Sequence, residues 1–207
     1  MPNVKGGKRS QRAAETRARI REAARELFLE RGYGATPLQD VADRAGVAVQ
    51  TIYFTFGNKR TLLKEVVDVS IAGDDAPVAT MERPWFRDAL AAETAEALLR
   101  ALVRGTRQLL ERVAPITEML RTAVTTDPDL AGLWRFDTDP RLAVHTAAAE
   151  ALVTKPGART DATVAADVLY GMLSPELYLL FTRDRGWSPG RWEEWVYDLV
   201  RARLCEP

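Results

Sequence analysis

The sequence predicts an all-α protein of about nine helices, with an N-terminal helix-turn-helix domain ahead of a larger helical domain. Apolar residues recur at three- and four-residue intervals through most of the chain, and no segment shows the alternation of a half-buried strand. Glycine and proline residues separate the helical stretches. With 207 residues, 46% of them hydrophobic, the chain is long enough to bury a sizeable core.

Four helices are expected in the N-terminal third of the chain. Thr36 and Pro37 open the second one as a capping box with proline at the first helical position. Gly46 can turn the chain with a positive φ and ends that helix, and Asn58 can cap the fourth. The expected helices span 12–31, 37–45, 48–55 and 59–72.

The rest of the chain is also predicted to be helical, after a linker over 73–84 that contains glycine and proline. Pro115 separates the first two helices that follow this linker. Pro140 and Pro175 are each expected to mark a kink, a break or a helix start. The expected helices of this part span 86–112, 115–125, 128–153, 162–183 and 189–204.

Charge is distributed unevenly along a chain whose net charge is zero. Residues 1–66 contain 13 Lys and Arg against 7 Asp and Glu, a net charge of +6, and residues 67–207 carry the compensating −6. A basic module joined to an acidic body is typical of a protein whose N-terminal part binds a polyanion such as nucleic acid.

Composition also predicts the cellular compartment. Cys205 is the only cysteine, so no internal disulfide can form. No run approaches the ~20 apolar residues that span a bilayer, and the basic N-terminus lacks the apolar segment of a signal peptide. We therefore expect a cytoplasmic protein without a membrane partner.

Residues 38–55 have the spacing of a helix-turn-helix. Ala42 precedes Gly46 by four residues, and Ile52 follows it by six. Two closely crossing helices need a small residue at the first position, a flexible one at the turn and an apolar contact at the third. The second helix would then face a DNA major groove. An ordinary helical hairpin without a DNA role is the alternative, and the basic charge of this region weighs against it.

Five motifs follow one another here with the order and spacing of a known family. They are Thr16-x3-Ile20, Ala23-Ala24-x2-Leu27-Phe28, Gly32-Tyr33-x-Ala35-Thr36, Val41-Ala42-x2-Ala45-Gly46-Val47 and Thr51-Ile52-Tyr53-x2-Phe56-x2-Lys59-x2-Leu62-Leu63. Over residues 16–66 the chain thereby resembles the DNA-binding domain of the TetR/AcrR family of bacterial transcriptional regulators. The resemblance implies a homodimer on a palindromic operator of double-stranded DNA, regulated by a small molecule. The chain departs from the family at Ala48, where a hydroxyl residue usually caps the third helix.

Three residues are expected to contact backbone phosphates. Tyr53 can pack its ring while its hydroxyl points outward to a phosphate. Lys59 begins the fourth helix, where a cation is placed poorly unless an anion lies nearby. Thr36 is expected to cap the second helix or to bind a phosphate at its N-terminus.

Base readout is expected from the start of the third helix. Gln50 can make a bidentate contact to adenine, and Val49 can touch a thymine methyl group. Thr51 either reads a base or bonds within its own helix. Ahead of the first helix, residues 1–11 form a basic arm that either contacts DNA or is simply flexible.

The C-terminal part is expected to hold an effector pocket and a dimer face. A cavity lined mainly by apolar side chains suits a small apolar or aromatic effector. Its candidate contacts, each of which also fits a plain core role, are Phe86, Met119, Trp134, Phe136 and His145. Apolar stripes on 162–183 and 189–204 predict a two-fold, four-helix interface, with burial inside one protomer as the alternative. The candidate interface residues are Met172, Trp192, Trp195 and Leu199.

An enzymatic role is not expected. One histidine and one terminal cysteine cannot supply the usual metal ligands, and the chain contains no P-loop, G-x-G-x-x-G or G-x-S-x-G motif. An all-carboxylate enzyme is the remaining catalytic alternative. We expect no metal and no cofactor.

The expected function is a DNA-binding regulator held at the nucleoid through its operator, a repressor with an activator as the alternative. Its expected divisions are a flexible basic arm over 1–11, a DNA-binding domain over 12–66 and a ligand-binding and dimerisation domain over 67–207. A ligand-binding or protein-interaction module with a degenerate DNA-binding domain is the alternative.

Overall fold

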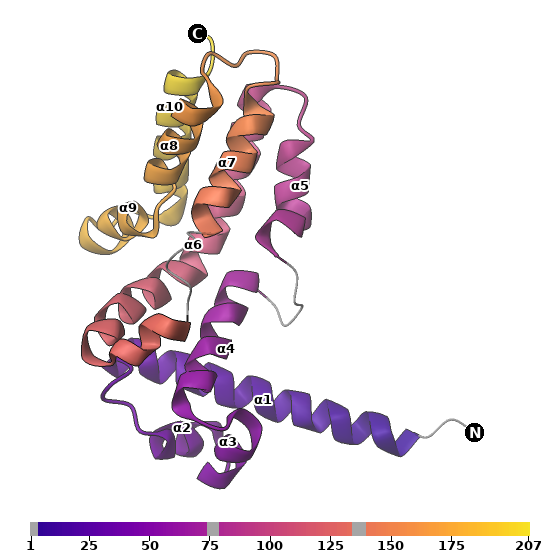
Figure 1. The fold of residues 1–207 in the computed structure, drawn as a ribbon, viewed down its shortest axis with the longest axis vertical. Coiled ribbons are helices and arrows are strands. Elements are labelled where there is room, and N and C mark those ends of the chain that lie inside the picture. The colour runs from indigo at the N-terminus through magenta and orange to yellow at the C-terminus, as the bar shows by residue number, and fades with distance from the viewer. Residues whose placement is uncertain (1–3, 74–78, 134–139) are drawn as a thin grey trace. The chain divides into compact units, whose positions relative to one another are not determined.

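A computed structural model of the protein describes residues 4–73, 79–133 and 140–207 (Figure 1). Within these ranges the chain is helical without a named strand, which confirms the all-α class. The helices are α1 (Val4–Arg31), α2 (Leu38–Ala45), α3 (Val49–Phe56), α4 (Lys59–Ala72), α5 (Pro84–Leu90), α6 (Ala95–Thr126), α7 (Pro140–Leu152), α8 (Ala162–Met172), α9 (Pro175–Leu179) and α10 (Pro189–Leu204). A π-helical turn over Leu180–Asp184 follows α9.

Two compact units divide the chain. The first combines Met1–Ser70 with Glu118–Trp134, so the end of α6 and the 3-10 turn after it pack with the N-terminal helices. The expected division of the chain assigned that later segment to the C-terminal domain. Apolar side chains that are almost completely buried form the core of this unit, among them Ile20, Leu27, Phe28, Ile52, Leu62 and Leu63.

Local capping determines the limits of the N-terminal helices. Gly46 ends α2 with a φ of 65°, as expected. The Asn58 Oδ1 atom accepts a hydrogen bond from the backbone N–H of Thr61 at 2.9 Å, which confirms Asn58 as the cap of α4. The start of α1 differs from expectation. This helix begins at Val4 and not at residue 12, so residues 4–11 are helical and continuous with it. The flexibility of this segment and its contact with DNA stay predictions.

Prolines act differently at three positions of the later helices. α7 begins at Pro140 and α9 at Pro175, so both prolines mark helix starts, where a missing N–H costs nothing. Pro115, in contrast, lies inside α6, which is one helix of 32 residues where the sequence predicts two. The neighbouring Ala114 and Ile116 are buried, and this packing outweighs the cost of the lost hydrogen bond.

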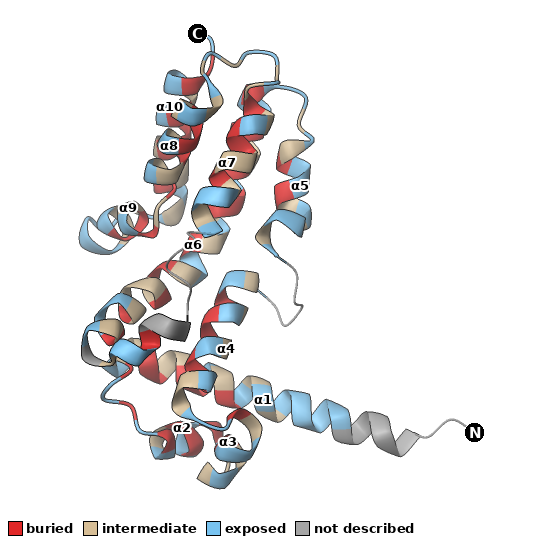
Figure 2. Ribbon diagram, viewed as in Figure 1, coloured by how far each residue is buried: buried red, intermediate tan, exposed pale blue. Residues whose placement is uncertain are grey.

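The second unit combines Ile71–Thr117 with Arg135–Pro207. Buried residues lie on the sides of α6, α7, α8 and α10 that face one another (Figure 2), with the fully buried Trp192 among them. α5 packs closely on α6 because residue 105 is glycine. A Cβ atom built on Gly105 would lie 2.1 Å from the Cε3 atom of Trp85.

One stretch, Ala162–Asp184, is long and apolar enough to cross a membrane by length and composition alone. It is not one uninterrupted α-helix, since α8 ends at Met172 and Ser174 caps the new helix that follows. Leu169, Tyr178 and other residues of this stretch belong to the core of the second unit. The stretch therefore carries little weight as a membrane span.

Candidate nucleic-acid interface

α2 and α3 meet at the turn that the sequence predicts. Ala42 and Ile52 are fully buried, and the backbone N–H of Val47 donates to the carbonyl oxygen of Ala42 at 3.0 Å. This bond closes the end of α2 next to the left-handed Gly46. Because residue 42 is no larger than alanine, the two helices can pack closely. The structure thus contains the geometry of a helix-turn-helix.

α1 and α4 support α3 from its inner side, where Phe56 is buried. The Arg17 guanidinium of α1 lies 4.8 Å from the centroid of the Phe56 ring, and its Nη1 donates to the carbonyl oxygen of Thr55 at 3.3 Å. On its other edge, Arg17 donates from Nε and Nη2 to the carboxylate of Glu65 on α4. This network fixes the C-terminal end of α3 against two other helices.

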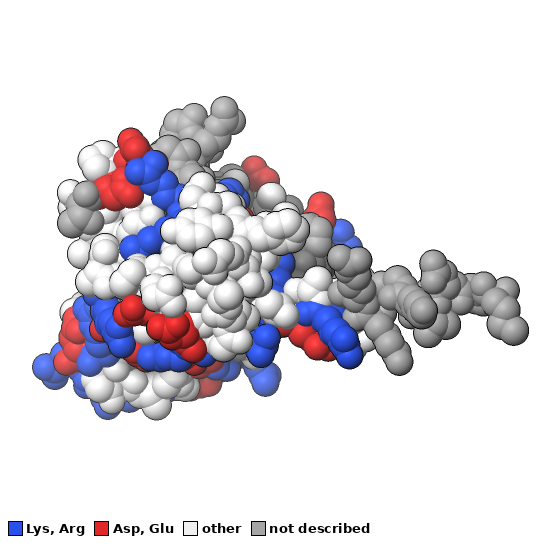
Figure 3. Space-filling model, turned by 90° about the horizontal axis from the view of Figure 1, so that it is seen from below, with Lys and Arg blue, Asp and Glu red and all other residues white. Residues whose placement is uncertain are grey.

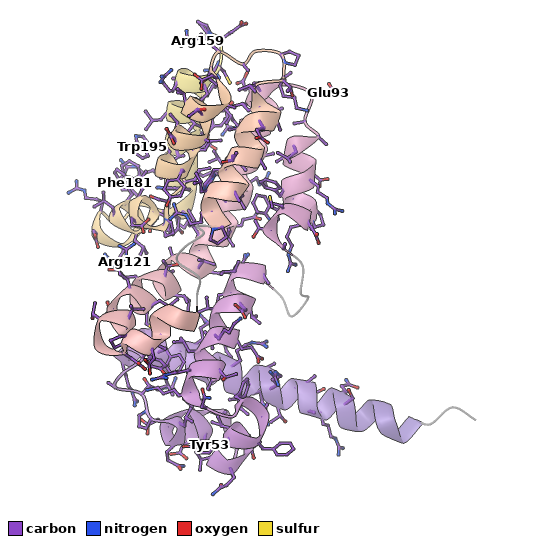
Figure 4. All side chains as sticks on the ribbon, viewed as in Figure 1. Tyr53, Glu93, Arg121, Arg159, Phe181 and Trp195 are labelled. Carbon is purple, nitrogen blue, oxygen red and sulfur yellow. The ribbon has the colours of Figure 1, made fainter. Side chains whose placement is uncertain are left out.

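The outer face of α3 is open to solvent and uncharged. Gln50, Tyr53 and Phe54 are exposed, Tyr53 by 54% and Phe54 by 93%, whereas Val49 and Thr51 are half-buried. Figure 4 shows the Tyr53 side chain pointing away from the helices behind it. The surface in Figure 3 has a broad uncharged area with both basic and acidic side chains around it. Such a face suits contacts to base edges better than contacts to phosphates.

Thr36 does not have either of its expected roles. Its side chain is fully buried, and its hydroxyl donates to the carbonyl oxygens of Gly32 at 2.8 Å and Leu27 at 3.2 Å. Pro37 occupies the N-cap of α2, and no side chain caps that helix. Thr36 instead satisfies carbonyl groups near the end of α1. Its burial leaves no hydroxyl for a phosphate, so this predicted contact was wrong.

Lys59 already has acceptors inside the first unit. Its Nζ donates to the carbonyl oxygen of Tyr33 at 2.5 Å and lies 4.2 Å from the centroid of the Tyr33 ring. Partial burial lowers the pKa of Lys59, and the negative charge of Asp127 acts in the opposite direction. A phosphate is therefore not needed to explain a cation at the start of α4. Its contact to DNA stays a prediction, as does that of Tyr53.

The start of α3 lacks the hydroxyl cap that is usual in the family, as the sequence predicts. Ala48 occupies the N-cap in an extended conformation, and no side chain bonds the free amides of the first turn. Among the amides of this turn, that of Thr51 donates to the carbonyl oxygen of Ala48 at 2.9 Å.

Sequence reasoning missed two features of this unit. Phe54 had a usable signal, because it lies two residues from each of the inward-facing Ile52 and Phe56 and so must point outward. The second feature is an ion pair between Arg60 and Asp127, in which Nη2 and Oδ1 lie 3.1 Å apart. No spacing rule predicts a pair that is separated by 67 residues.

The candidate effector contacts do not form one described site. Phe86 and His145 are buried in the second unit, where the His145 ring lies edge-on to Tyr170 with centroids 6.1 Å apart. Met119 is buried in the first unit. The remaining two candidates, Trp134 and Phe136, lie outside the described residues. Within the described ranges, no three His, Cys, Asp or Glu side chains form a group that could hold a metal ion.

The candidate dimer residues fall into two groups. Trp192 is fully buried and packs edge-on against Tyr178, with ring centroids 5.0 Å apart, so it belongs to the core of its own protomer. Its predicted place in the interface was wrong, because the inner side of its helix packs within the unit. The others remain accessible: Met172 and Trp195 are half-buried and Leu199 is 41% exposed. Trp195 also contacts Phe181, with centroids 4.5 Å apart (Figure 4).

Comparison with known proteins identifies relatives of the helix-turn-helix. Residues 20–66 match the model of the tetR family of bacterial regulatory proteins. The HTH-type transcriptional regulator TtgR of Pseudomonas putida is 46% identical over 56 residues, which is 27% of each chain. The chain therefore matches about a quarter of the length of this relative. The HTH-type transcriptional regulator AlkX of Mycobacterium tuberculosis is 31% identical over 153 residues, 64% of this chain and 72% of AlkX.

Solved structures share the whole fold. A TetR-family protein of Mesorhizobium loti is 24% identical with a TM-score of 0.71, covering 94% of this chain and 99% of its own. SmeT in complex with triclosan is 20% identical with a TM-score of 0.65, covering 93% and 92%. Since the chain is 31% identical to AlkX over 72% of that regulator and its residues 20–66 match the family model, it belongs to the TetR family of bacterial regulatory proteins.

Proposed function

We propose that the protein is a DNA-binding transcriptional regulator that reads its operator with α3. The observation that carries this proposal is the outer face of α3, where Gln50, Tyr53 and Phe54 are exposed on a helix held rigidly from behind. A helix of this kind fits the B-DNA major groove, which is about 12 Å wide. The net charge of +6 over residues 1–66 favours approach to a polyanion. TtgR and AlkX, both named transcriptional regulators, support the same function.

The second part of the proposal is a homodimer on a palindromic operator. One helix-turn-helix gives modest specificity, whereas a two-fold pair reads two half-sites about 34 Å apart. Leu180 and Leu199 are 47% and 41% exposed and are thus accessible to a partner. We therefore assign the dimer face to Met172, Trp195 and Leu199, without Trp192.

The third part is a small apolar effector that releases the protein from its operator, which makes it a repressor. SmeT, a protein of the same fold, was solved with the apolar aromatic compound triclosan, and this supports the chemical class. Phe86, Met119 and His145 stay candidate contacts. α6 contributes residues to both compact units, so a ligand that shifts one end of this helix has a covalent route to the other. Operator binding would place the protein in the cytoplasm, at the nucleoid.

The test uses the full-length protein and the intergenic DNA next to its own gene. By fluorescence anisotropy near 0.15 M salt, we expect this duplex to bind roughly 10³-fold more tightly than a scrambled duplex of equal composition. Equal affinities would favour the alternative of a ligand-binding or interaction module with a degenerate DNA domain. Raised transcription from this promoter after deletion of the gene would support a repressor, and lowered transcription an activator.

A further inference from the structure

Phe54 is the most exposed large apolar side chain in the described part of the protein. It is 93% exposed, and the next most exposed is its neighbour Tyr53 at 54%. The other exposed large apolar residues range from 41% to 47%. A phenylalanine that remains in water contributes almost nothing to folding, since its stabilising effect comes from burial. Its position therefore calls for a partner outside the protomer.

The geometry of α3 gives Phe54 a direction. It lies four residues after Gln50, so the two side chains occupy one face of the helix. Ile52 and Phe56, each two residues away, are buried on the opposite face. Phe54 thus points away from the core, beside a residue proposed to read a base.

The charge around the outer face of α3 indicates which kind of partner can cover Phe54. α3 contains no charged residue, and Arg44 and Arg60 belong to the helices on either side of it. The surrounding sequence, residues 1–66, carries +6 and would repel a second copy of itself. Duplex DNA is the partner whose backbone matches this charge and whose major groove accepts the uncharged helix.

On the basis of the proposed function, we infer that Phe54 is a specificity-determining residue that recognises thymine. A phenyl ring cannot donate or accept a conventional hydrogen bond, so it gains nothing from the polar edges of guanine, adenine or cytosine. Thymine alone presents an apolar group in the major groove, its C5-methyl. Phe54 contacts one or two such methyl groups in each half-site, about one helical turn of α3 away from the base that Gln50 contacts.

The inference is tested by removing single methyl groups from the operator. Full-length protein is titrated into duplexes of the intergenic DNA in which one thymine at a time is replaced by deoxyuracil, which keeps base pairing. Wild type should bind about fourfold more weakly at one or two positions per half-site, equivalent to about 0.8 kcal/mol for a lost methyl contact. In Phe54→Ala the thymine-to-deoxyuracil ratio at those positions should fall to about one.

Two variants serve as controls. Gln50→Ala should alter the preference for adenine and keep the methyl effect at the positions assigned to Phe54. Phe54→Leu, which retains an apolar side chain, should keep part of that effect. All three variants should melt as wild type does, because both side chains are exposed.

The outcomes separate this inference from the proposed function. Unchanged thymine-to-deoxyuracil ratios in Phe54→Ala, or no methyl effect in wild type, overturn the role of Phe54 while operator binding stands. A wild-type protein that does not distinguish the intergenic duplex from scrambled DNA overturns the proposed function and the inference with it.

Discussion

Arg60 at the start of α4 forms a bidentate ion pair with the carboxylate of Asp127, the residue that follows α6. Its Nε lies 3.3 Å from Oδ2 and its Nη2 3.1 Å from Oδ1, and Nη2 also lies 2.9 Å from Oδ2 of Asp129. The hydrogen bonds that Arg60 donates to Asp127 raise the pKa of Arg60. Because the first part of α6 belongs to the other compact unit, this pair ties the end of a shared helix to the helix that carries Lys59.

The Arg60–Asp127 pair predicts the relative stabilities of four variants. Asp127→Asn should lower the urea midpoint slightly, because exposed ion pairs contribute little even when bidentate. Asp129→Asn is the matched control and should have a smaller effect, since Asp129 is the more exposed and only its Oδ2 atom pairs with Arg60, at 2.9 Å. The double variant Arg60→Gln/Asp127→Asn should be as stable as Arg60→Gln alone. Fully additive effects of the two changes would show that the pair contributes nothing.

Lys59→Met separates a structural role from a DNA contact. Loss of the bond to the Tyr33 carbonyl and of the ring contact should reduce the free energy of unfolding by about 1–2 kcal/mol. If Lys59 also binds a phosphate, the slope of log K against log salt should fall by about one. The control is Tyr53→Phe, which should leave stability unchanged and weaken binding to all sequences about equally. A Lys59→Met protein with the wild-type salt slope would remove Lys59 from the DNA interface.

Two glycines in helices should respond in opposite ways to alanine. Gly105→Ala introduces a methyl group against the Trp85 ring, and we expect this overpacking to cost about 1–3 kcal/mol. At Gly171 in α8 nothing lies within 4 Å of an added Cβ, so alanine should stabilise the helix by up to about 1 kcal/mol. Thermal melts of both variants would check this. A Gly105→Ala variant as stable as wild type would show that α5 shifts easily on α6.

Local features were predictable from sequence, and features set by distant packing were not. Gly46 ends α2 through its backbone conformation and Asn58 caps α4 through its side chain, so the predicted helix ends match the structure. Thr36 has a capping-box sequence, yet carbonyls near the end of α1 take its hydroxyl. Trp192 lies on an apolar stripe that fits a core as well as an interface, and periodicity alone cannot choose. Asp127 acquires its partner only through the fold.

The dimer face is testable at an accessible leucine. Leu199→Glu should convert a dimer to monomers at micromolar concentration, because it places a charge in an apolar interface. Leu142→Glu on α7 is the control: Leu142 is 47% exposed, similar to Leu199, and lies outside the proposed face. Light scattering of both variants gives the mass directly. A Leu199→Glu protein that keeps the dimer mass, or a monomeric wild type, would contradict the assignment to α8 and α10.

The effector prediction rests on thermodynamic linkage. Effectors are sought among small apolar aromatic compounds that raise the melting temperature of the pure protein. When titrated into the protein–operator complex, these compounds should reduce operator affinity roughly 5- to 150-fold, a coupling of about 1–3 kcal/mol. Linkage requires the operator to weaken effector binding by the same factor, which calorimetry on the complex can check.

Asp127→Asn then tests the route of this coupling. The variant should bind the effector as wild type does and transmit less of its effect, because α6 is no longer tied to the start of α4 by the full ion pair. If it transmits the wild-type effect, the coupling runs elsewhere, for example through α4, which also extends past the limit of the first unit. A ligand with equal affinity for two states cannot shift their balance. If chemically diverse compounds bind tightly and all leave operator affinity unchanged, the result would favour control by protein abundance or by a protein partner.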